Sequence, residues 1–451
     1  MLSREKNWGE IVKEHSGIEK EPLLSAIHHA LTFNVDQVEE RYDGEKGFSF
    51  GAHVRSLTTV KSATREPLDL VMNALFKQES LHSLIGSSHE DGSHSMFSLY
   101  GSGGVGILPI KLAHWLLAKS LALPGGAIEA VDKLDSFLTS NSVEGMHVTV
   151  VAGIYISETI HLDDQISIFP IIDLPASLGR DSLVEFLSSM AQYLPRAGRT
   201  GAPALAAVVK RFEMRPATVP SLEKLPNWIG YHHSEFDQLA TLAHALSLLD
   251  ETKPQIVARW ISTSEPDTIP GLTGGTMGDT DIASHVQKRF DRVDLSDSKE
   301  ITQSMRAFLS FEERKELELP LERLSMFRTK RDFRDKALEL GTALESFFMD
   351  VSSNSDLSHK IGVRGAIYSS NNRDQRLNNF KLLKAAYRLR SEVIHGTRVN
   401  PTKIVKGPLN MKGEDVLENT AKLLLNCIRK TLKSKKYPNW ENVDLDVEND
   451  T

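Results

Sequence analysis

The sequence contains a single cysteine, Cys427, among 451 residues, and it has no long uninterrupted apolar run. One thiol excludes an internal disulfide, which fits the reducing cytoplasm better than a disulfide-stabilised secreted protein. The longest apolar stretch, residues 105–123, includes Lys111, His114 and Lys119, so it predicts a buried or amphipathic helix and not a membrane span. The first residues, MLSREKNWGE, lack the apolar core of a signal peptide. We expect a cytoplasmic protein that does not associate with a membrane.

A chain of this length is expected to form two or three domains with substantial cores. The patterns predict an α+β multidomain protein, in which a mixed helical and β N-terminal region precedes a C-terminal all-α bundle. The expected segments are a mainly helical region (1–145), a mixed α/β region (146–265), a loop or linker (266–300), the helical bundle (301–436) and an acidic disordered tail (437–451).

Apolar periodicity gives the expected elements of the N-terminal region. Helices are predicted at 22–31, 67–76, 107–123, 127–138 and 237–249, and strands at 147–156, 166–172 and 255–263. Residues 205–214 fit a strand and a short helix equally well.

The segment from Gly101 to Gly106 satisfies G-x-G-x-x-G and follows a possible strand, MFSLY. Such a loop holds a dinucleotide when it leads from a strand directly into a helix within a βαβ unit. Here Pro109 delays the helix, and no βαβ series surrounds the segment. We interpret it as a glycine turn that enters a helix. A nucleotide-dependent enzyme built on this loop is the competing hypothesis from a different class.

A cluster of His82, His89, His94, Glu90 and Asp91 offers metal-ligating side chains, but its spacing matches no standard metal site. We interpret it as a polar loop. The sequence predicts neither a metal nor a cofactor.

Charge is distributed unevenly along the chain. Residues 321–436 contain 24 Lys and Arg against 12 Asp and Glu, whereas the whole chain has a formal net charge of −7. Charge runs usually decorate solvated helix faces. An excess that covers more than a hundred residues of an acidic protein favours contact with a polyanion such as RNA.

The basic segment has helical periodicity throughout, with four helices expected at 330–349, 356–368, 376–395 and 414–432. Short connections between them predict an antiparallel bundle. The core face of the third helix is expected to include Phe380, Leu383, Tyr387 and Ile394, and Gly396 is a suitable C-terminal stop.

At the end of that third helix the sequence YRLRSEVIHG places Arg390 five residues before His395. A histidine can take a proton from a ribose 2′-OH or give one to a leaving 5′-oxygen. An arginine can hold the scissile phosphate through two hydrogen bonds. Five positions differ by about 140° around an ideal helix, so the two side chains do not share a face. Two copies of the chain would supply two such pairs around one phosphate.

Three strings carry a family resemblance: ALELGTALESFF, HKIGVRGAIY and NNFKLLKAAYRLRSEVIHG. Over residues 320–435 they resemble the HEPN (higher eukaryotes and prokaryotes nucleotide-binding) family, in its ApeA-like branch. The resemblance implies a four- or five-helix bundle that forms a homodimer. Many members are metal-independent endoribonucleases of anti-phage and abortive-infection systems.

Carried over by motif, Arg390 matches the family's arginine, Ser391 its polar residue and His395 its histidine. Glu345 matches an acidic residue that often accompanies them on a preceding helix. The implied reaction leaves a 2′,3′-cyclic phosphate and a 5′-OH. The N-terminal region would act as a sensor or regulator with an unknown trigger, for which a phage component is one candidate. The competing interpretation is a catalytically silent module that binds RNA or nucleotide, or assembles with a partner.

Overall fold

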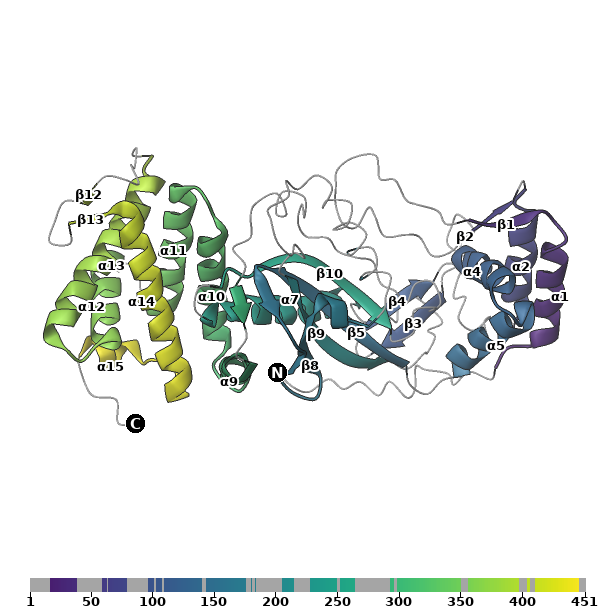
Figure 1. Ribbon diagram of the computed structural model, residues 1–451, viewed down its shortest axis with the longest axis horizontal. Helices are drawn as coiled ribbons and strands as arrows, with labels where there is room; N and C mark the ends of the chain where they lie inside the picture. Colours follow the sequence, from purple (N-terminus) through teal and green to yellow (C-terminus); the bar gives the residue numbers. More distant parts are fainter. Residues whose placement is uncertain are drawn as a thin grey trace.

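The structure is a computed structural model, and it describes residues 17–38, 59–62, 64–78, 96–100, 103–107, 109–139, 143–175, 180, 183, 205–214, 228–249, 252–263, 293–295, 298–349, 356–396, 404–405 and 410–445. Figure 1 shows three parts along the long axis of the molecule. A group of N-terminal helices occupies one end, an antiparallel sheet lies in the middle, and the C-terminal helices occupy the other end.

The N-terminal helices are α1 (Lys20–Ala30), α2 (Glu66–Lys77), α4 (Pro109–Ala122) and α5 (Gly126–Thr139). Their apolar faces form a separate core that includes Leu23, Leu75, Leu116 and Val131. The four helices expected between residues 22 and 138 are confirmed, because their apolar residues recur at helical spacing and are buried on one side.

Two antiparallel strand pairs also belong to this region, which is therefore less uniformly helical than predicted. They are β1 (Val35–Val38) with β2 (Thr59–Ser62), and β3 (Met96–Tyr100) with β4 (Gly103–Ile107). Gly103, Gly104 and Gly106 thus lie in a strand that pairs back onto MFSLY, and helix α4 begins only at Pro109. This arrangement contradicts both the dinucleotide fingerprint and the glycine turn that enters a helix, since neither expectation places a second strand there.

The central sheet is fully antiparallel, with strand order β10 (Gln255–Thr263), β5 (Val143–Ala152), β9 (Leu205–Met214), β8 (Ile166–Pro170) and β7 (Ile160–His161). A 3₁₀ turn, η3 (Ile171–Asp173), ends β8, and β6 (Ile154–Ile156) pairs in parallel with β11 (Val293–Leu295). The pattern of residues 205–214 fits both a strand and a short helix. The segment is a strand, because it pairs with both β5 and β8.

Helix α7 (Trp228–Ala245), continued by η5 (Leu246–Leu248), packs on one face of the sheet. His147 of β5 is fully buried on this face, and its ring centroid lies 4.7 Å from that of Phe212 and 5.4 Å from that of Phe236. Burial, with a smaller contribution from the charge of Lys210, lowers the pKa of His147 to about 4. The histidine is therefore neutral at neutral pH and serves as a packing residue.

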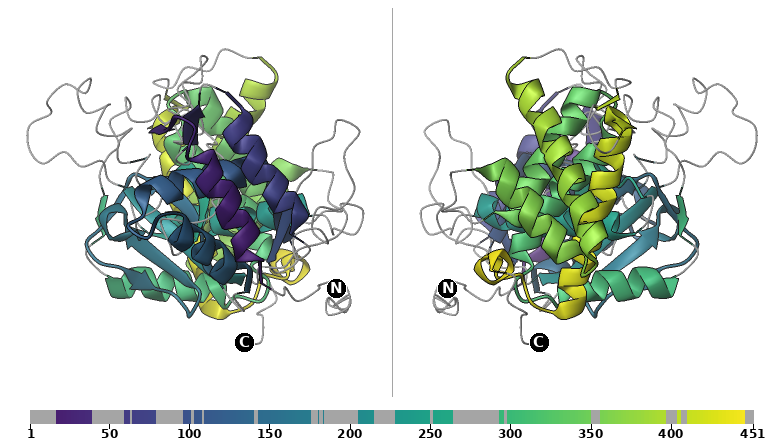
Figure 2. Two further views of the ribbon diagram at one scale, coloured as in Figure 1. Left: turned by 90° about the vertical axis from the view of Figure 1, so that its right-hand side faces the viewer. Right: turned by 90° about the vertical axis from the view of Figure 1, so that its left-hand side faces the viewer.

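The C-terminal region is helical apart from the short pair β12 (Ile404–Val405) and β13 (Met411–Lys412). Its helices are α9 (Ser298–Leu309), α10 (Lys315–Thr329), α11 (Phe333–Phe348), α12 (Leu357–Ser369), α13 (Arg373–Ile394), α14 (Gly413–Ser434) and α15 (Trp440–Asp444). Figure 2 shows α12, α13 and α14 side by side at this end of the molecule. The four helices expected in this region are confirmed, and α9, α10 and α15 join them.

Side-chain caps explain where two of these helices begin. Asp332 accepts hydrogen bonds from the backbone N–H groups of Arg334 and Asp335, and this starts α11. Asn372 does the same for α13 through the N–H groups of Asp374 and Gln375. Such caps satisfy N–H groups that have no partner within the first turn of a helix.

The sheet and the C-terminal helices share one continuous hydrophobic core, which runs from residues such as Val208 and Leu242 to Leu344 and Leu424. Arginines reinforce the junction by donating to backbone carbonyls of the sheet region. They are Arg306 to Leu162, Arg328 to Ser247 and Thr252, and Arg429 to Leu248. The fold is thus a mixed α/β region with an antiparallel sheet, followed by an all-helical region, as the sequence predicts.

The expectation of a disordered tail over 437–451 is wrong for residues 437–445. Trp440 is 3% exposed and packs against the rings of Phe347, Phe348 and Tyr368. Asp444 accepts hydrogen bonds from the buried guanidinium of Arg364, at 2.8 Å from Nη2. The expectation of disorder is based on the acidic composition of the tail. Composition does not show that one buried tryptophan and one ion pair hold α15 on the bundle.

Candidate active site

Helix α13 carries three of the four residues of the candidate site, close to its C-terminal end. The helix ends at Ile394, His395 is its C-cap, and Gly396 follows with φ +71°. Glycine takes this left-handed conformation at little cost, which fixes the end of the helix here. The stop expected at Gly396 is confirmed.

Arg390 lies against α11. A Cβ atom built on Gly341 would stand 2.4 Å from Cγ of Arg390, so the arginine stem crosses α11 where that helix has no side chain. The Arg390 side chain is 23% exposed and retains access to solvent. The glycine of ALELGTALESFF thus opens the space through which the arginine reaches its partners.

Glu345 and Tyr387 complete what we term the Arg390 network (Glu345, Tyr387 and Arg390). Nη2 of Arg390 donates to Oε2 of Glu345 at 3.1 Å, and the Tyr387 hydroxyl donates to Oε1 at 2.5 Å. Nη1 of Arg390 also donates to the Tyr387 hydroxyl at 3.3 Å, and the guanidinium carbon lies 5.3 Å from the centre of the Tyr387 ring. Both Glu345 oxygens are therefore engaged, and the guanidinium is oriented from two sides.

Tyr387 remains protonated under all ordinary conditions. Burial, followed by its hydrogen bond to the Glu345 carboxylate, raises the pKa of Tyr387 to about 12, although the charge of Arg390 opposes this shift. The phenol therefore acts as a hydrogen-bond donor to Glu345 and not as an acid or base near neutral pH.

His395 lies outside this network. Its backbone N–H donates to the Ser391 carbonyl at 3.0 Å, and its side chain is exposed. Within the described part of the chain, neither the His395 ring nor the Ser391 hydroxyl makes a hydrogen bond. The structure thus brings Glu345 and Arg390 together and leaves Ser391 and His395 apart from them, as the angular separation along one helix requires.

Ile394 is 51% exposed, so the expectation that it faces the core is wrong. It follows buried Tyr387 by seven residues and therefore lies on nearly the same side of an ideal helix. Its exposure means that the last turn of α13 extends beyond the helices that cover Tyr387. An apolar side chain consequently lies at the surface directly beside His395.

Two residues of the site were not expected to have a role there. The sequence pattern places Tyr387 on the core face of its helix and indicates no role for Gly341 in the site. Tyr387 precedes Arg390 by three positions and Gly341 precedes Glu345 by four, and these spacings place each pair on one side of its helix. That spacing was the available signal. The contact between α11 and α13, which joins the two pairs, was not visible in either helix alone.

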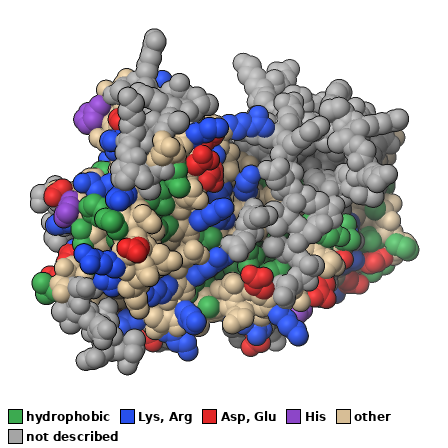
Figure 3. All heavy atoms as spheres, turned by 60° about the vertical axis from the view of Figure 1, so that its left-hand side comes forward, with side chains coloured by type: hydrophobic (Ala, Val, Ile, Leu, Met, Phe, Trp, Pro, Cys, Tyr) green, Lys and Arg blue, Asp and Glu red, His purple; other side chains and the backbone are tan. Residues whose placement is uncertain are grey.

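The C-terminal end of the molecule, which carries the site, has more basic than acidic side chains on the face in view in Figure 3. Figure 3 shows Lys and Arg side chains spread over the C-terminal end of the molecule, with fewer acidic side chains among them. In the described ranges, no group of three or more His, Cys, Asp or Glu side chains is arranged to hold a metal. His82, His89 and His94 lie outside those ranges. No described helix has both the length and the apolar character needed to cross a membrane.

Comparisons with known proteins give no significant match to a family model, a curated protein or a solved structure.

Proposed function

We propose that the chain is a HEPN-type, metal-independent endoribonuclease that works as a homodimer in defence against phage. The observation that carries the proposal is the placement of Arg390 and His395 at the end of α13. A guanidinium oriented by Glu345 and Tyr387 lies within one and a half turns of an exposed histidine, in a segment with an excess of Lys and Arg. This combination supplies a phosphate ligand and a proton carrier without a metal.

In the proposed reaction, His395 removes the proton from a ribose 2′-OH, and the 2′-oxygen attacks the adjacent phosphorus. The bond from phosphorus to the 5′-oxygen breaks, and the same histidine of a second copy donates a proton to that oxygen. Arg390 neutralises the charge that develops on the phosphate oxygens. The products are a 2′,3′-cyclic phosphate and a 5′-OH, and DNA is not cut because it has no 2′-OH.

A second copy supplies what one chain lacks. Within one chain Arg390 is paired with Glu345 of α11, whereas His395 is exposed at the C-cap of α13 and lies outside that network. The half-exposed Ile394 beside His395 is an apolar contact point that a second copy would cover. Facing ends of α13 would bring two arginines and two histidines to one phosphate, with Ser391 free to donate to a phosphate oxygen.

One observation favours a second candidate, a catalytically silent module that binds RNA or assembles with a partner. Arg390 already pairs with Glu345, and this ion pair is sufficient reason for an arginine that joins α11 to α13. In the nuclease, by contrast, Glu345 orients the guanidinium and leaves its remaining N–H groups for the phosphate. The two candidates differ in whether His395 is needed for any reaction.

The α/β region is proposed to restrain or trigger the nuclease. It shares a continuous core with the C-terminal helices, so a change in the sheet can reach the bundle through packed side chains.

Expression in a bacterial host tests the proposal. Wild type, His395→Ala and Arg388→Ala would be induced with and without phage infection. RNA fragments with 5′-OH ends would be mapped, and host growth would be followed in the same cultures. Arg388 is the matched control, because it is an exposed arginine on α13 two residues before Arg390. We expect wild type and Arg388→Ala to fragment RNA and arrest growth during infection, and His395→Ala to do neither. Equal behaviour of all three proteins would favour the silent module.

A further inference from the structure

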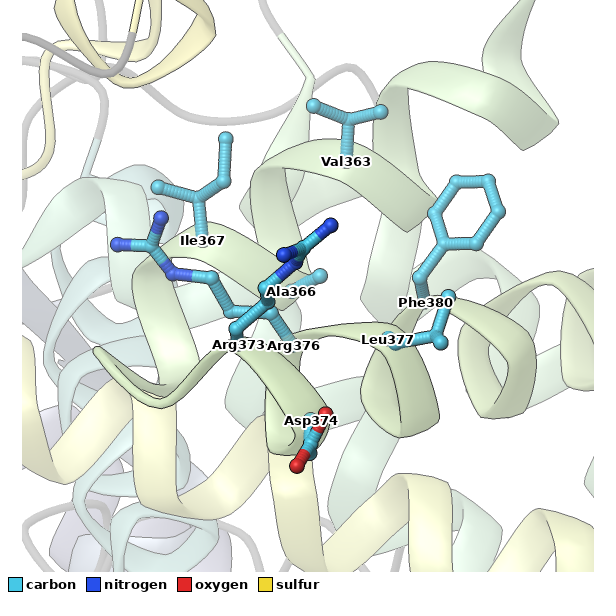
Figure 4. Close-up of a pocket in the computed structure, with 8 residues that line it drawn as sticks. All are labelled: Val363, Ala366, Ile367, Arg373, Asp374, Arg376, Leu377 and Phe380. Atoms are coloured by element: carbon cyan, nitrogen blue, oxygen red, sulfur yellow. The ribbon is translucent and has the colours of Figure 1, made fainter.

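A surface depression of about 450 Å³ lies between α12 and α13, away from the candidate active site. Val363, Ala366 and Ile367 of α12 form one wall, and the first two turns of α13 form the other (Figure 4). This volume is within the range of small-ligand sites.

The lining has two chemically different ends. Leu377 and Phe380 lie at one end, Arg373 and Arg376 lie at the other, and the carboxylate of Asp374 also belongs to the lining (Figure 4). Leu377 is 51% exposed, so about half of its side chain is open to solvent beside the ring of Phe380. The depression therefore offers an apolar surface at one end and two guanidinium groups at the other, and these outnumber the single carboxylate of Asp374.

The two arginines differ in how firmly they are held. Nε of Arg376 donates to the Ser370 carbonyl at 2.7 Å, which fixes that side chain along the edge of the depression. Arg373 is exposed at the first position of α13 and makes no hydrogen bond or ion pair with any described residue. Its guanidinium is available to an incoming anion.

The wider surface has the same sign of charge. Residues 356–396 contain eight Lys and Arg against three Asp and Glu. Lys384 lies over the Phe380 ring, with Nζ 5.3 Å from its centre, and adds a third cation at the apolar end. A cationic ligand is disfavoured by this charge, and a purely apolar ligand would leave the arginines without a role. The fitting ligand combines a flat, largely apolar group with an anion, and a nucleotide unit has this chemistry.

We propose that this depression binds one unpaired nucleotide of the RNA substrate, with the base against Leu377 and Phe380 and a phosphate at Arg373. The inference rests on the proposed function, since it names the RNA as the ligand. From Leu377 to His395 the helix rises about 27 Å, at 1.5 Å per residue. The bound nucleotide therefore lies several nucleotides from the cleaved bond. A base within a duplex is stacked and cannot enter, so the site selects RNA that is single-stranded on that side of the cut.

Equilibrium binding of fluorescent RNA to the full chain tests the proposal, with His395→Ala as the background so that RNA stays intact. The probes are a short single-stranded RNA, the same RNA without bases, and a blunt RNA duplex. Leu377→Ser removes the exposed apolar contact, and Arg373→Ala removes the free cation. Arg334→Ala is the matched control, because it removes an exposed arginine from the first turn of α11.

We expect Leu377→Ser to weaken binding of the single-stranded RNA about five-fold or more and to leave binding of the base-free RNA unchanged. Arg373→Ala should weaken single-stranded RNA more than Arg334→Ala does and lower the salt dependence by about one ion. Binding of the duplex should be the same in the background protein and in Leu377→Ser.

Three results would overturn the proposal. In the first, Leu377→Ser and Arg373→Ala bind the single-stranded RNA as tightly as Arg334→Ala does. In the second, a free nucleoside monophosphate displaces the fluorescent RNA as effectively as unlabelled RNA does. In the third, Leu377→Ser would change the oligomeric state in sedimentation, which would make the depression a contact between copies. The binding experiment does not depend on cleavage. If the wild type does not cut RNA, the proposed function is wrong, but the measured contribution of Leu377 and Arg373 to RNA binding is unaffected.

Discussion

At the scale of single residues, Arg390 illustrates how a long side chain gains a fixed position. Gly341 lets its stem cross α11, and Glu345 and Tyr387 then hold the guanidinium from two sides. A flexible arginine loses considerable side-chain entropy when a ligand immobilises it. In this network part of that entropy is lost on folding, before a phosphate arrives.

Tyr387→Phe tests this arrangement. The change removes the hydroxyl that donates to Glu345 and accepts from Arg390. We expect the free energy of unfolding to decrease by about 1 kcal/mol. RNA cleavage should fall more than binding does, because the guanidinium is less well oriented for the phosphate. Urea denaturation and single-turnover cleavage measure the two effects. Unchanged cleavage with reduced stability would show that the hydroxyl serves only the fold.

His147 gives the protein a sensitivity to acid. Its pKa is about 4 in the fold, against an ordinary value near 6.5, so below pH 6.5 the unfolded chain takes up a proton that the fold does not. His147 should therefore contribute a decrease in the free energy of unfolding from about pH 6.5 to pH 5, by up to about 1.4 kcal/mol per pH unit. Urea midpoints at several pH values test this, with His147→Gln expected to show a shallower slope. A midpoint that is constant over this range would contradict the assignment.

Residue-scale prediction from sequence succeeded where local chemistry decides the outcome. Gly396 ends α13 because of its backbone freedom, as its position after the helix predicts. It failed for Ile394, whose exposure depends on how far the neighbouring helices extend. Spacing along one helix contains no information about the length of another.

At the scale of elements, α15 shows how few contacts can order a short segment. Trp440 lies among the rings of Phe347, Phe348 and Tyr368, and Asp444 neutralises the buried Arg364. Arg364 also donates to the Phe348 carbonyl at 2.8 Å, so a single guanidinium links α11, α12 and α15. The five-residue helix therefore closes one end of the bundle.

Asp444→Ala should be among the most destabilising surface substitutions in the chain. It leaves the 3%-exposed Arg364 guanidinium without its counter-charge, and we expect a loss of about 3 kcal/mol. Glu441→Ala is the control, since it removes an exposed carboxylate from the same helix. Thermal or urea unfolding separates the two variants, and equal stabilities would mean that the ion pair contributes little.

Prediction of secondary structure from the sequence was accurate for long periodic segments. It was inaccurate for segments that form a strand only because another strand pairs with them. The helices over 330–349 and 414–432 were expected from spacing alone and are present as α11 and α14. The glycine-rich segment 103–107 became a strand only because β3 lies beside it. Pairing between strands is a property of two segments, so the pattern of one segment does not determine it.

At the scale of the whole molecule, sheet and bundle share one core, whereas the N-terminal helices have their own. The surface at the end of α13 is then the place where a second copy would complete the proposed site. Ile394→Asp should convert the proposed dimer into monomers and abolish the proposed cleavage while the fold is retained, because it places a charge in an apolar contact. Sedimentation over a range of concentrations measures the assembly.

Ile128→Asp provides the control for this prediction, since Ile128 is 57% exposed on α5 at the opposite end of the molecule. Its assembly and cleavage should match those of wild type. If Ile394→Asp assembles as wild type does, the end of α13 is not the contact between copies.

The most direct measurement is cleavage of a defined RNA by the purified chain in the presence of EDTA, with analysis of the product ends. Wild type and Arg388→Ala are expected to cut the RNA and leave 2′,3′-cyclic phosphate and 5′-OH ends. His395→Ala and Arg390→Ala should be folded and inactive, and a 2′-deoxy substitution at the cut site should protect the RNA. Cleavage that EDTA abolishes, or that His395→Ala retains, would contradict the proposed function.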